Sequence, residues 1–425
     1  MGHMENPRQR SRNRGARGEA RDRHSHFLVC GGGNPMVEKD RSVICRAVHR
    51  HEHRLPLLER LEVMVRGGEE FVEGQRHGPP IAEAEVSRYP CRAMPDIHLP
   101  ALYQPHVLIE ATGERSILEL DKAQIIALYK SHGALLFSGF GVDVAQFGTF
   151  AKQFCATSVV NESPGREPVD AAANVFTVDA GKGAFALHPE LSREPWKPDV
   201  AFFGCQIAPR AGGRTTICDG VALARELPEP VRRALEPRRL LYIKPVWPAL
   251  LDYWLGTTEP SDAQLAAPPP GCPYFFRRYP DTGILRVFTR PALHKPMFID
   301  ELAFGNFLLF ARFNHGRSDH PVLDDGQAVP EAWLQAIKAT GDRLTAEIEW
   351  NAGDLLMLDN TRFLHGRTAI VDTAERVILT YFGYLDFAIP SPEEPENAIW
   401  RRENFEPPLR PDHPRLHQGN SPPAV

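Results

Sequence analysis

Short apolar runs separated by turn residues dominate the second half of the chain. Seven such runs lie between residues 200 and 385, and Gly, Pro, Asp and Asn residues stand between them: VAFFGCQIA, RTTICDG, RRLLYIK, GILRVFT, LTAEIEW, GDLLMLDN and RVILTYFGYL. Strands of this length and spacing are typical of an all-β barrel or jelly roll. We therefore expect a mainly β fold.

Helical periodicity precedes these runs and interrupts them twice. LDKAQIIALYKSH at 120–132 has apolar residues at helical spacing and ends before Gly133, and the next residues, ALLFSGF, predict a short buried strand. In DVAQFGTFAKQF, Asp143 is a suitable N-cap, and four apolar residues fall on one face: Val144, Phe147, Phe150 and Phe154. Further helices are expected at about 221–235 and 330–340. These helices would flank the β core.

The chain divides into three parts by composition. Residues 1–94 are rich in arginine at their start and lack apolar periodicity, so we expect a largely disordered extension. A single β domain is expected at 95–412, and a disordered tail at 413–425. Within the domain, 246–280 is rich in proline and aromatic residues and fits no regular element; together with 155–180 it is a candidate lid.

The composition excludes several classes of partner. Hydrophobic residues make up 42% of the chain, an ordinary value for a globular protein. The net charge is −5, so the chain has no excess of positive charge with which to bind nucleic acid or an anionic membrane. No apolar run approaches the roughly 18 residues that a membrane-spanning helix needs. The seven cysteines are scattered without a C-x-x-C motif, as in a reducing cytoplasm. We expect a cytoplasmic protein acting on a small molecule, and the sequence does not fix its oligomeric state.

His188 and Glu190 stand two residues apart, with Pro189 between them. With 17 histidines and 54 acids in 425 residues, about two His-x-acid triplets are expected by chance, and the chain has two. In a strand both side chains would point to the same face, and the proline would place that strand at an edge. The triplet alone therefore does not establish a metal site.

His365 can complete the set. It follows an apolar strand and an Asp359-Asn360 turn, and two imidazoles with one carboxylate form the facial triad of non-haem Fe(II) oxygenases. His315 also precedes Gly-Arg but lacks the preceding Gly-Asp strand, and we expect it in a loop. Eleven residues after His365 stands Arg376, whose guanidinium suits the remote carboxylate of a dicarboxylate co-substrate.

Thr215 is a second candidate contact to that carboxylate. It follows two glycines and an arginine in APRAGGRTTICDG, 27 residues after His188, and its hydroxyl can donate a hydrogen bond. A strand threonine buried in the core and a surface arginine are the alternative interpretations of Thr215 and Arg376.

These ordered motifs resemble the TauD/TfdA family of Fe(II)- and 2-oxoglutarate-dependent dioxygenases over roughly residues 100–390. The resemblance rests on HGALLFSGF, HPELS, VAFFGCQIAPRAGGRTTI and GDLLMLDNTRFLHGR, followed by Arg376. It implies a double-stranded β-helix (jelly roll, cupin-like) core. His188, Glu190 and His365 would bind Fe(II), Arg376 and Thr215 would hold 2-oxoglutarate, and O2 would be the second co-substrate.

Two positions narrow the resemblance. Family members commonly have Asp where this chain has Glu190, and glutamate there resembles the clavaminate synthase-like and SyrP-like branch. Sulfonate-processing relatives carry an arginine at the position of Thr380, so a taurine-like substrate is disfavoured. A carboxylate at 190 also leaves no vacancy for chloride, which argues against a halogenase.

The resemblance implies hydroxylation of an unactivated C–H bond in an amino acid, free or tethered to a carrier protein, in natural-product (antibiotic-like) biosynthesis. Desaturation, epoxidation or cyclisation by the same chemistry is an alternative, and a non-catalytic metal-binding or ligand-binding barrel is a remote one. Five residues are candidate substrate contacts: Asn161, Glu162, Arg166, His315 and Thr380.

Overall fold

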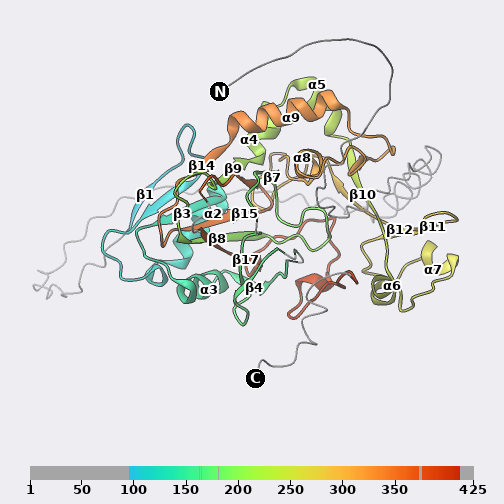
Figure 1. The fold of residues 1–425 in the computed structure, drawn as a ribbon, viewed down its shortest axis with the longest axis horizontal. Coiled ribbons are helices and arrows are strands. Elements are labelled where there is room, and N and C mark those ends of the chain that lie inside the picture. The colour runs from blue at the N-terminus through green and yellow to red at the C-terminus, as the bar shows by residue number, and fades with distance from the viewer. Residues whose placement is uncertain (1–94, 162, 164, 180, 373–375, 412–425) are drawn as a thin grey trace, which may run out of the picture. The chain divides into compact units, whose positions relative to one another are not determined.

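The computed structural model describes residues 95–161, 163, 165–179, 181–372 and 376–411 (Figure 1). The extension expected at 1–94 and the tail expected at 413–425 lie outside the described residues, as does Glu162.

The largest sheet has nine strands in the order β1-β2-β3-β15-β8-β17-β6-β5, and β4 also pairs with β17. Among the strand pairs that the described residues form in this sheet, β2 with β3 is parallel and the others are antiparallel. Its strands are β1 Asp96–His98, β2 Val107–Glu110, β3 Ala134–Ser138, β4 Cys155–Ser158, β5 Pro168–Asp170, β6 Val175–Thr177, β8 Val200–Ile207, β15 Leu355–Asp359 and β17 Val377–Leu385.

A four-stranded sheet in the order β14-β9-β16-β7 contributes the other wall of the core. Its strands are β7 Phe185–His188, β9 Thr215–Asp219, β14 Ala346–Ile348 and β16 Phe363–Arg367. Phe203 and Leu356 of the large sheet share one hydrophobic cluster with Ile217 and Ile348 of the small one. These sheets form the double-stranded β-helix core, and they stay separate sheets instead of closing into one hydrogen-bonded barrel.

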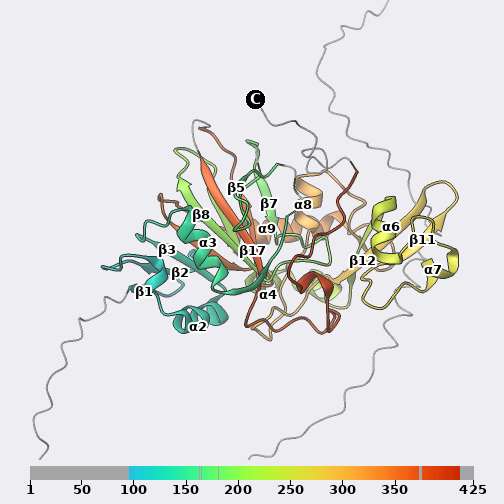
Figure 2. The ribbon, with the colours of Figure 1, turned by 90° about the horizontal axis from the view of Figure 1, so that it is seen from below.

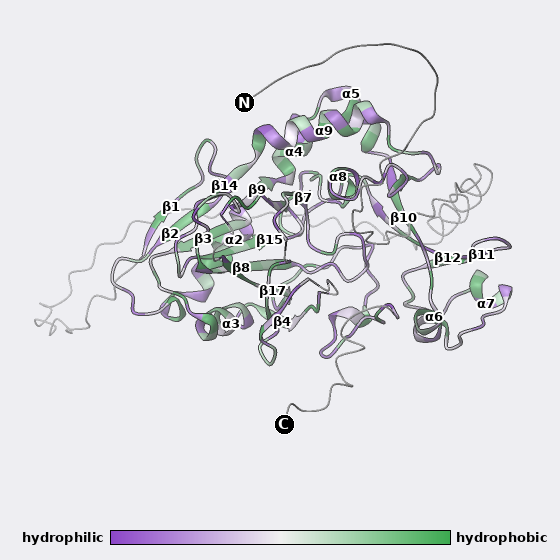
Figure 3. Cartoon of the chain, in the orientation of Figure 1, coloured by the Kyte–Doolittle hydropathy of each residue, from purple (hydrophilic) through white to green (hydrophobic). Residues whose placement is uncertain are grey.

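The other face of the nine-stranded sheet is covered by α2 (Lys122–His132) and α3 (Val144–Lys152). Alternate residues of β8 point to opposite faces, so Phe202 packs beside Phe147 and Phe150 of α3 while Phe203 points into the core. Because both faces are covered, β8 and β15 are continuous apolar runs. Figure 3 shows these central strands as mainly hydrophobic, whereas α9 alternates between polar and apolar residues.

Helices α4 (Gly220–Glu226) and α9 (Glu331–Leu344) pack against the four-stranded sheet. The remaining helical elements near the core are α5 Glu229–Leu235, α8 Leu308–Phe313, and the short 3-10 helices η1 Ile117–Glu119 and η2 Ile399–Arg401. Asp143 is the N-cap of α3, as expected, and takes part in a capping box. Gly133 follows α2 as its C-cap, with a φ of 76°.

A third sheet has the order β11-β12-β10-β13. Its strands are β10 Arg239–Pro245, β11 Phe275–Tyr279, β12 Gly283–Pro291 and β13 Val322–Leu323. Figures 1 and 2 both place β11, α6 (Pro248–Leu255) and α7 (Asp262–Ala266) on the side away from β1 to β3. The expectation that 246–280 lacks regular structure is wrong. This segment forms α6, α7 and β11, which are too short to show a clear periodicity.

All seven strand predictions and the helices expected at 120–132, 143–154, 221–235 and 330–340 are confirmed. The expected fold class, mainly β with flanking helices, is confirmed as well.

Candidate metal centre

His188, Glu190 and His365 meet between the two core sheets. One ligand atom from each of these buried side chains lies within 4.8 Å of the others. Among the described residues, no other group of histidine, cysteine and acid side chains has this geometry. Bonds of about 2.0–2.2 Å to a metal would require only small side-chain movements from this arrangement. The donor set therefore fits a metal such as iron.

Strand pairing brings the two histidines together. β7 pairs with β16 so that His188 lies directly opposite His365, and their ring centroids are 4.6 Å apart. β7 is the edge strand of its sheet, as Pro189 predicts. The ring of Phe203 on the large sheet lies 5.0 Å from that of His365 and closes the centre from the opposite side.

One backbone contact orients the His188 ring. Its Nδ1 lies 2.8 Å from the carbonyl oxygen of Ala186, so an Nδ1–H donates there and Nε2 keeps its lone pair. Burial, and then the nearby His365, lower the pKa of His188 to about 3. The imidazole is therefore neutral at physiological pH, as a metal ligand must be.

Glu190 lies beyond the end of β7, in a turn. The expectation that it shares a strand face with His188 is wrong, because Pro189 cannot donate to the ladder and the strand ends at His188. The next residue, Leu191, is fully buried with a φ of 51°, a strained conformation for this side chain. Strain of about 1–3 kcal/mol is characteristic of functional sites.

Asn360 holds the backbone of Glu190 in place. Its Oδ1 accepts from the Glu190 amide at 2.7 Å, and its Nδ2 donates to the carbonyl oxygens of Glu190 at 3.1 Å and Pro198 at 2.8 Å. Asn360 is 1% exposed, so these three bonds face no competition from water. The Asp359-Asn360 turn thus fixes the carboxylate-bearing turn across the core.

Two further side chains bind the Glu190 carboxylate. Asn161 Nδ2 donates to Oε1 at 2.7 Å, and Arg166 Nη2 donates to Oε2 at 3.0 Å. Oε2 also lies 3.7 Å from His365 Nε2. Burial alone would raise the pKa of Glu190, but Arg166 and His365 hold it well below its usual range. The carboxylate is therefore ionised, as metal binding requires.

Arg376 and Thr215 line the same small cavity as His188 and His365. Arg376 Nε donates to the carbonyl oxygen of Gly213 at 2.8 Å, which orients the guanidinium. Burial, and then Arg367, lower its pKa to about 10, so it stays charged at neutral pH. The Thr215 hydroxyl accepts from Trp350 Nε1 at 3.0 Å, and its own proton is left to donate to an anion.

The other predicted contacts are distributed around this cavity. Arg166 lines it, and its Nη1 donates to Thr380 Oγ1 at 3.0 Å. His315 lies in a loop after α8, as expected, and its ring faces Phe310, which in turn lies 4.4 Å from the His188 ring. Asn161 and Arg166 therefore contact the Glu190 carboxylate directly. His315 contacts Phe310, which lies between it and His188.

Sequence reasoning missed four side chains around the centre: Asn360, Arg367, Phe203 and Phe310. Arg367 donates to the carbonyl oxygens of Asp179, Gly181 and Gly183 and so ties down the segment before β7. The His-Gly-Arg motif contained the signal for Arg367, because it lies two residues after His365 on the same strand face. Asn360 resembled a simple turn residue.

Two facing sheets with two histidines and a carboxylate between them define the class of non-haem iron oxygenases. The model of the taurine catabolism dioxygenase TauD, TfdA family matches residues 104–381. The chain belongs to this family, and it is an Fe(II)- and 2-oxoglutarate-dependent oxygenase that uses O2 as co-substrate.

Several known proteins are similar to this chain. The dapdiamide synthesis protein DdaC of Enterobacter agglomerans is 23% identical over 318 residues, which are 69% of this chain and 95% of DdaC. PvcB of Pseudomonas aeruginosa is 16% identical with a TM-score of 0.46, covering 71% of this chain and 94% of PvcB. A putative α-ketoglutarate-dependent taurine dioxygenase of Burkholderia xenovorans is 14% identical with a TM-score of 0.47, covering 71% and 96%.

None of the helices in the described ranges has the length and apolar content that crossing a bilayer requires.

Proposed function

We propose that His188, Glu190 and His365 bind the Fe(II) ion and that Arg376 and Thr215 hold the remote carboxylate of 2-oxoglutarate. The observation that carries this assignment is the convergence of the three ligand atoms to within 4.8 Å, beside a cavity that Arg376 and Thr215 also line. When bound, iron with 2-oxoglutarate and O2 supplies the oxidant for an unactivated C–H bond.

The protein's own residues prepare this chemistry in three ways. The Ala186 carbonyl fixes the tautomer of His188, and Asn161 and Arg166 keep Glu190 ionised and oriented. Phe203 and Phe310 place apolar rings against the two histidines and limit the access of water. Gly213 orients Arg376 so that its remaining N–H groups can donate to a carboxylate.

We further propose that the substrate is an amino acid, free or tethered to a carrier protein, and that the reaction is a hydroxylation in a biosynthetic pathway. Arg166 and Asp179 both line the cavity as an ion pair 3.5 Å apart, and the carboxylate and ammonium groups of an amino acid would pair with these two charges. The name of DdaC, a dapdiamide synthesis protein, supports a biosynthetic role. Thr380 accepts a hydrogen bond from Arg166 and would therefore contribute to the same substrate site.

The metal and co-substrate assignments are tested by anaerobic titration of Fe(II) into the apo-protein with 2-oxoglutarate, followed by visible absorption. A weak charge-transfer band is expected in the wild type and should be lost in His188→Ala. Arg376→Ala should form the band only at much higher 2-oxoglutarate concentration, because it lacks the bidentate contact.

His315→Ala is the matched control, since His315 also precedes Gly-Arg but lies behind Phe310. It should keep the band of the wild type. Absence of the band from folded wild-type protein, or its loss in His315→Ala alone, would contradict the assignment. The substrate class is then tested by measuring which amino acids raise succinate formation and appear as hydroxylated product.

A further inference from the structure

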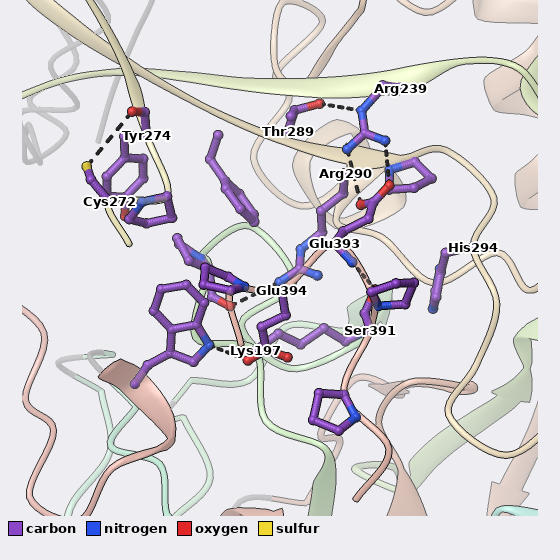
Figure 4. Close-up of a pocket in the computed structure, with 18 of the residues that line it drawn as sticks. Lys197, Arg239, Cys272, Tyr274, Thr289, Arg290, His294, Ser391, Glu393 and Glu394 are labelled. Atoms are coloured by element: carbon purple, nitrogen blue, oxygen red, sulfur yellow. Dashed lines mark hydrogen bonds and ion pairs between the residues drawn. The ribbon is translucent and has the colours of Figure 1, made fainter. Parts of the chain in front are cut away.

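A second cavity lies apart from the metal-binding cluster. It has a volume of about 2150 Å³, and its walls come from the third sheet, the 195–199 segment and residues 389–401 (Figure 4). Pockets for small organic ligands usually have about 300–1,000 Å³, so this one can hold a whole organic molecule. Its described lining residues include neither the three metal-binding candidates nor Thr215 and Arg376.

Most acidic side chains around this cavity are already neutralised by partners. Arg239 donates to both oxygens of Glu393, at 2.7 and 3.2 Å, and Figure 4 shows this pair on the cavity wall. Arg401 binds Asp199 through two bonds of 2.8 and 2.9 Å, and it also binds Glu394. Each of these three carboxylates therefore already has an arginine as its direct partner.

Two cations on the same wall, Lys197 and Arg290, form no hydrogen bond or close ion pair with an acid among the described residues, although carboxylates act on both from a longer distance. Lys197 makes no hydrogen bond or ion pair with any residue that the structure describes, although burial and the nearby Arg290 lower its pKa to about 7. Within the described part of the chain, Arg290 donates to the carbonyl oxygens of Glu194 and Pro195 alone, and its buried Nε has no hydrogen-bond partner there. The acids whose charge acts on Lys197 are Asp359 and Asp199, and both already accept hydrogen bonds, from Thr361 and Arg401 respectively.

The third basic group nearby is uncharged. His294 Nε2 lies 2.7 Å from the carbonyl oxygen of Thr361, and burial, with Lys197 close by, lowers the pKa of His294 to about 3. A partly buried ammonium and guanidinium are costly when no carboxylate pairs with them directly, and here the carboxylates of the cavity wall are bound by Arg239 and Arg401. Charge-assisted hydrogen bonds to an oxyanion would remove that cost.

We propose that Lys197 and Arg290 bind the carboxylate or phosphate group of a second small molecule, whose organic part occupies the rest of this cavity. Tyr274, Phe288 and Trp400 supply apolar walls for that part. The site is distinct from the one proposed for 2-oxoglutarate, which lies at Arg376. Carboxylate and phosphate share the chemistry that the two cations recognise, and separate titrations distinguish them.

The test is calorimetric titration of inorganic phosphate, and separately of acetate, into the full-length protein at constant ionic strength. Saturable binding of at least one anion is expected, and the tighter one identifies the recognised group. Lys197→Met should weaken binding at least tenfold, and its side chain loses no existing hydrogen bond. Lys197→Arg keeps the charge and should retain binding.

Two controls separate this site from others. Lys295 lines the same cavity but is paired with Asp300 at 2.9 Å, so Lys295→Met should bind the anion as the wild type does. Arg376→Ala should also retain binding. Absence of saturable binding of both anions, equal affinity in Lys197→Met, or loss of binding in Arg376→Ala would each overturn the proposal.

Discussion

Asn360→Ala removes the side chain that holds the turn carrying Glu190. Three hydrogen bonds disappear, and the Glu190 amide and two carbonyl oxygens are left in a site where Asn360 itself was 1% exposed. At about 1 kcal/mol for each lost bond, the free energy of unfolding should fall by about 3 kcal/mol. Because Glu190 is then less well oriented, Fe(II) affinity should also fall, by about 10- to 100-fold.

The two effects are measured separately, by urea unfolding of the apo-protein and by anaerobic Fe(II) titration. Asn306→Ala is the matched control: Asn306 is equally buried and makes two such bonds, to Ala292 and Leu308, away from the centre. It should lose about 2 kcal/mol of stability and keep its Fe(II) affinity. Unchanged stability in Asn360→Ala, or an equal loss of affinity in both variants, would refute the reasoning.

Two further predictions concern packing and pH. Gly366→Ala should lower Fe(II) affinity in the same titration and cost about 1–3 kcal/mol of stability, because a methyl group there overlaps the Phe185 carbonyl oxygen across the β7–β16 pair. Gly341→Ala, which meets only side-chain methyl groups at 3.2 and 3.4 Å, should keep the affinity. Burial lowers the pKa of His294 to about 3, so the unfolded chain takes up the proton first. Stability should therefore decline as the pH falls from about 6.5 towards 3, by up to about 1.4 kcal/mol per unit. Urea unfolding at pH 7, 6 and 5 should show a shallower decline in His294→Gln, and an equal decline would contradict the assignment.

The core strands could be predicted because their apolar runs reflect burial on both faces. Val200–Ile207 lies between two layers, so its sequence is continuously apolar and its bounds are clear. That His188, Glu190 and His365 lie together could also be predicted, because two histidines and a carboxylate in this order are a chemical pattern that does not depend on exact strand bounds. Residues 246–280 were different: α6 and α7 have 8 and 5 residues, fewer than periodicity needs.

The role of Asn360 could not be predicted for a different reason. Its partner Glu190 lies 170 residues away, and an asparagine after an aspartate in a turn has a sufficient local explanation. Likewise, the opposite charges of Arg166 and Asp179 in one cavity depend on how the 155–180 segment folds back over the core. Long-range hydrogen bonds between polar side chains leave no periodic trace in the sequence.

The turn after His188 is held on both sides of Glu190, and these contacts link the candidate metal centre to the third sheet. Asn360 holds Glu190 itself, while Glu194, four residues on, is bound by Lys244 of β10 and by Arg286 of β12. Burial alone would raise the pKa of Glu194, but these two cations lower it to about 2, so the charged cluster persists at neutral pH. The residues that follow, including Lys197, line the second cavity. A displacement of the third sheet would therefore act on the backbone that positions the Glu190 carboxylate, through a segment only a few residues long.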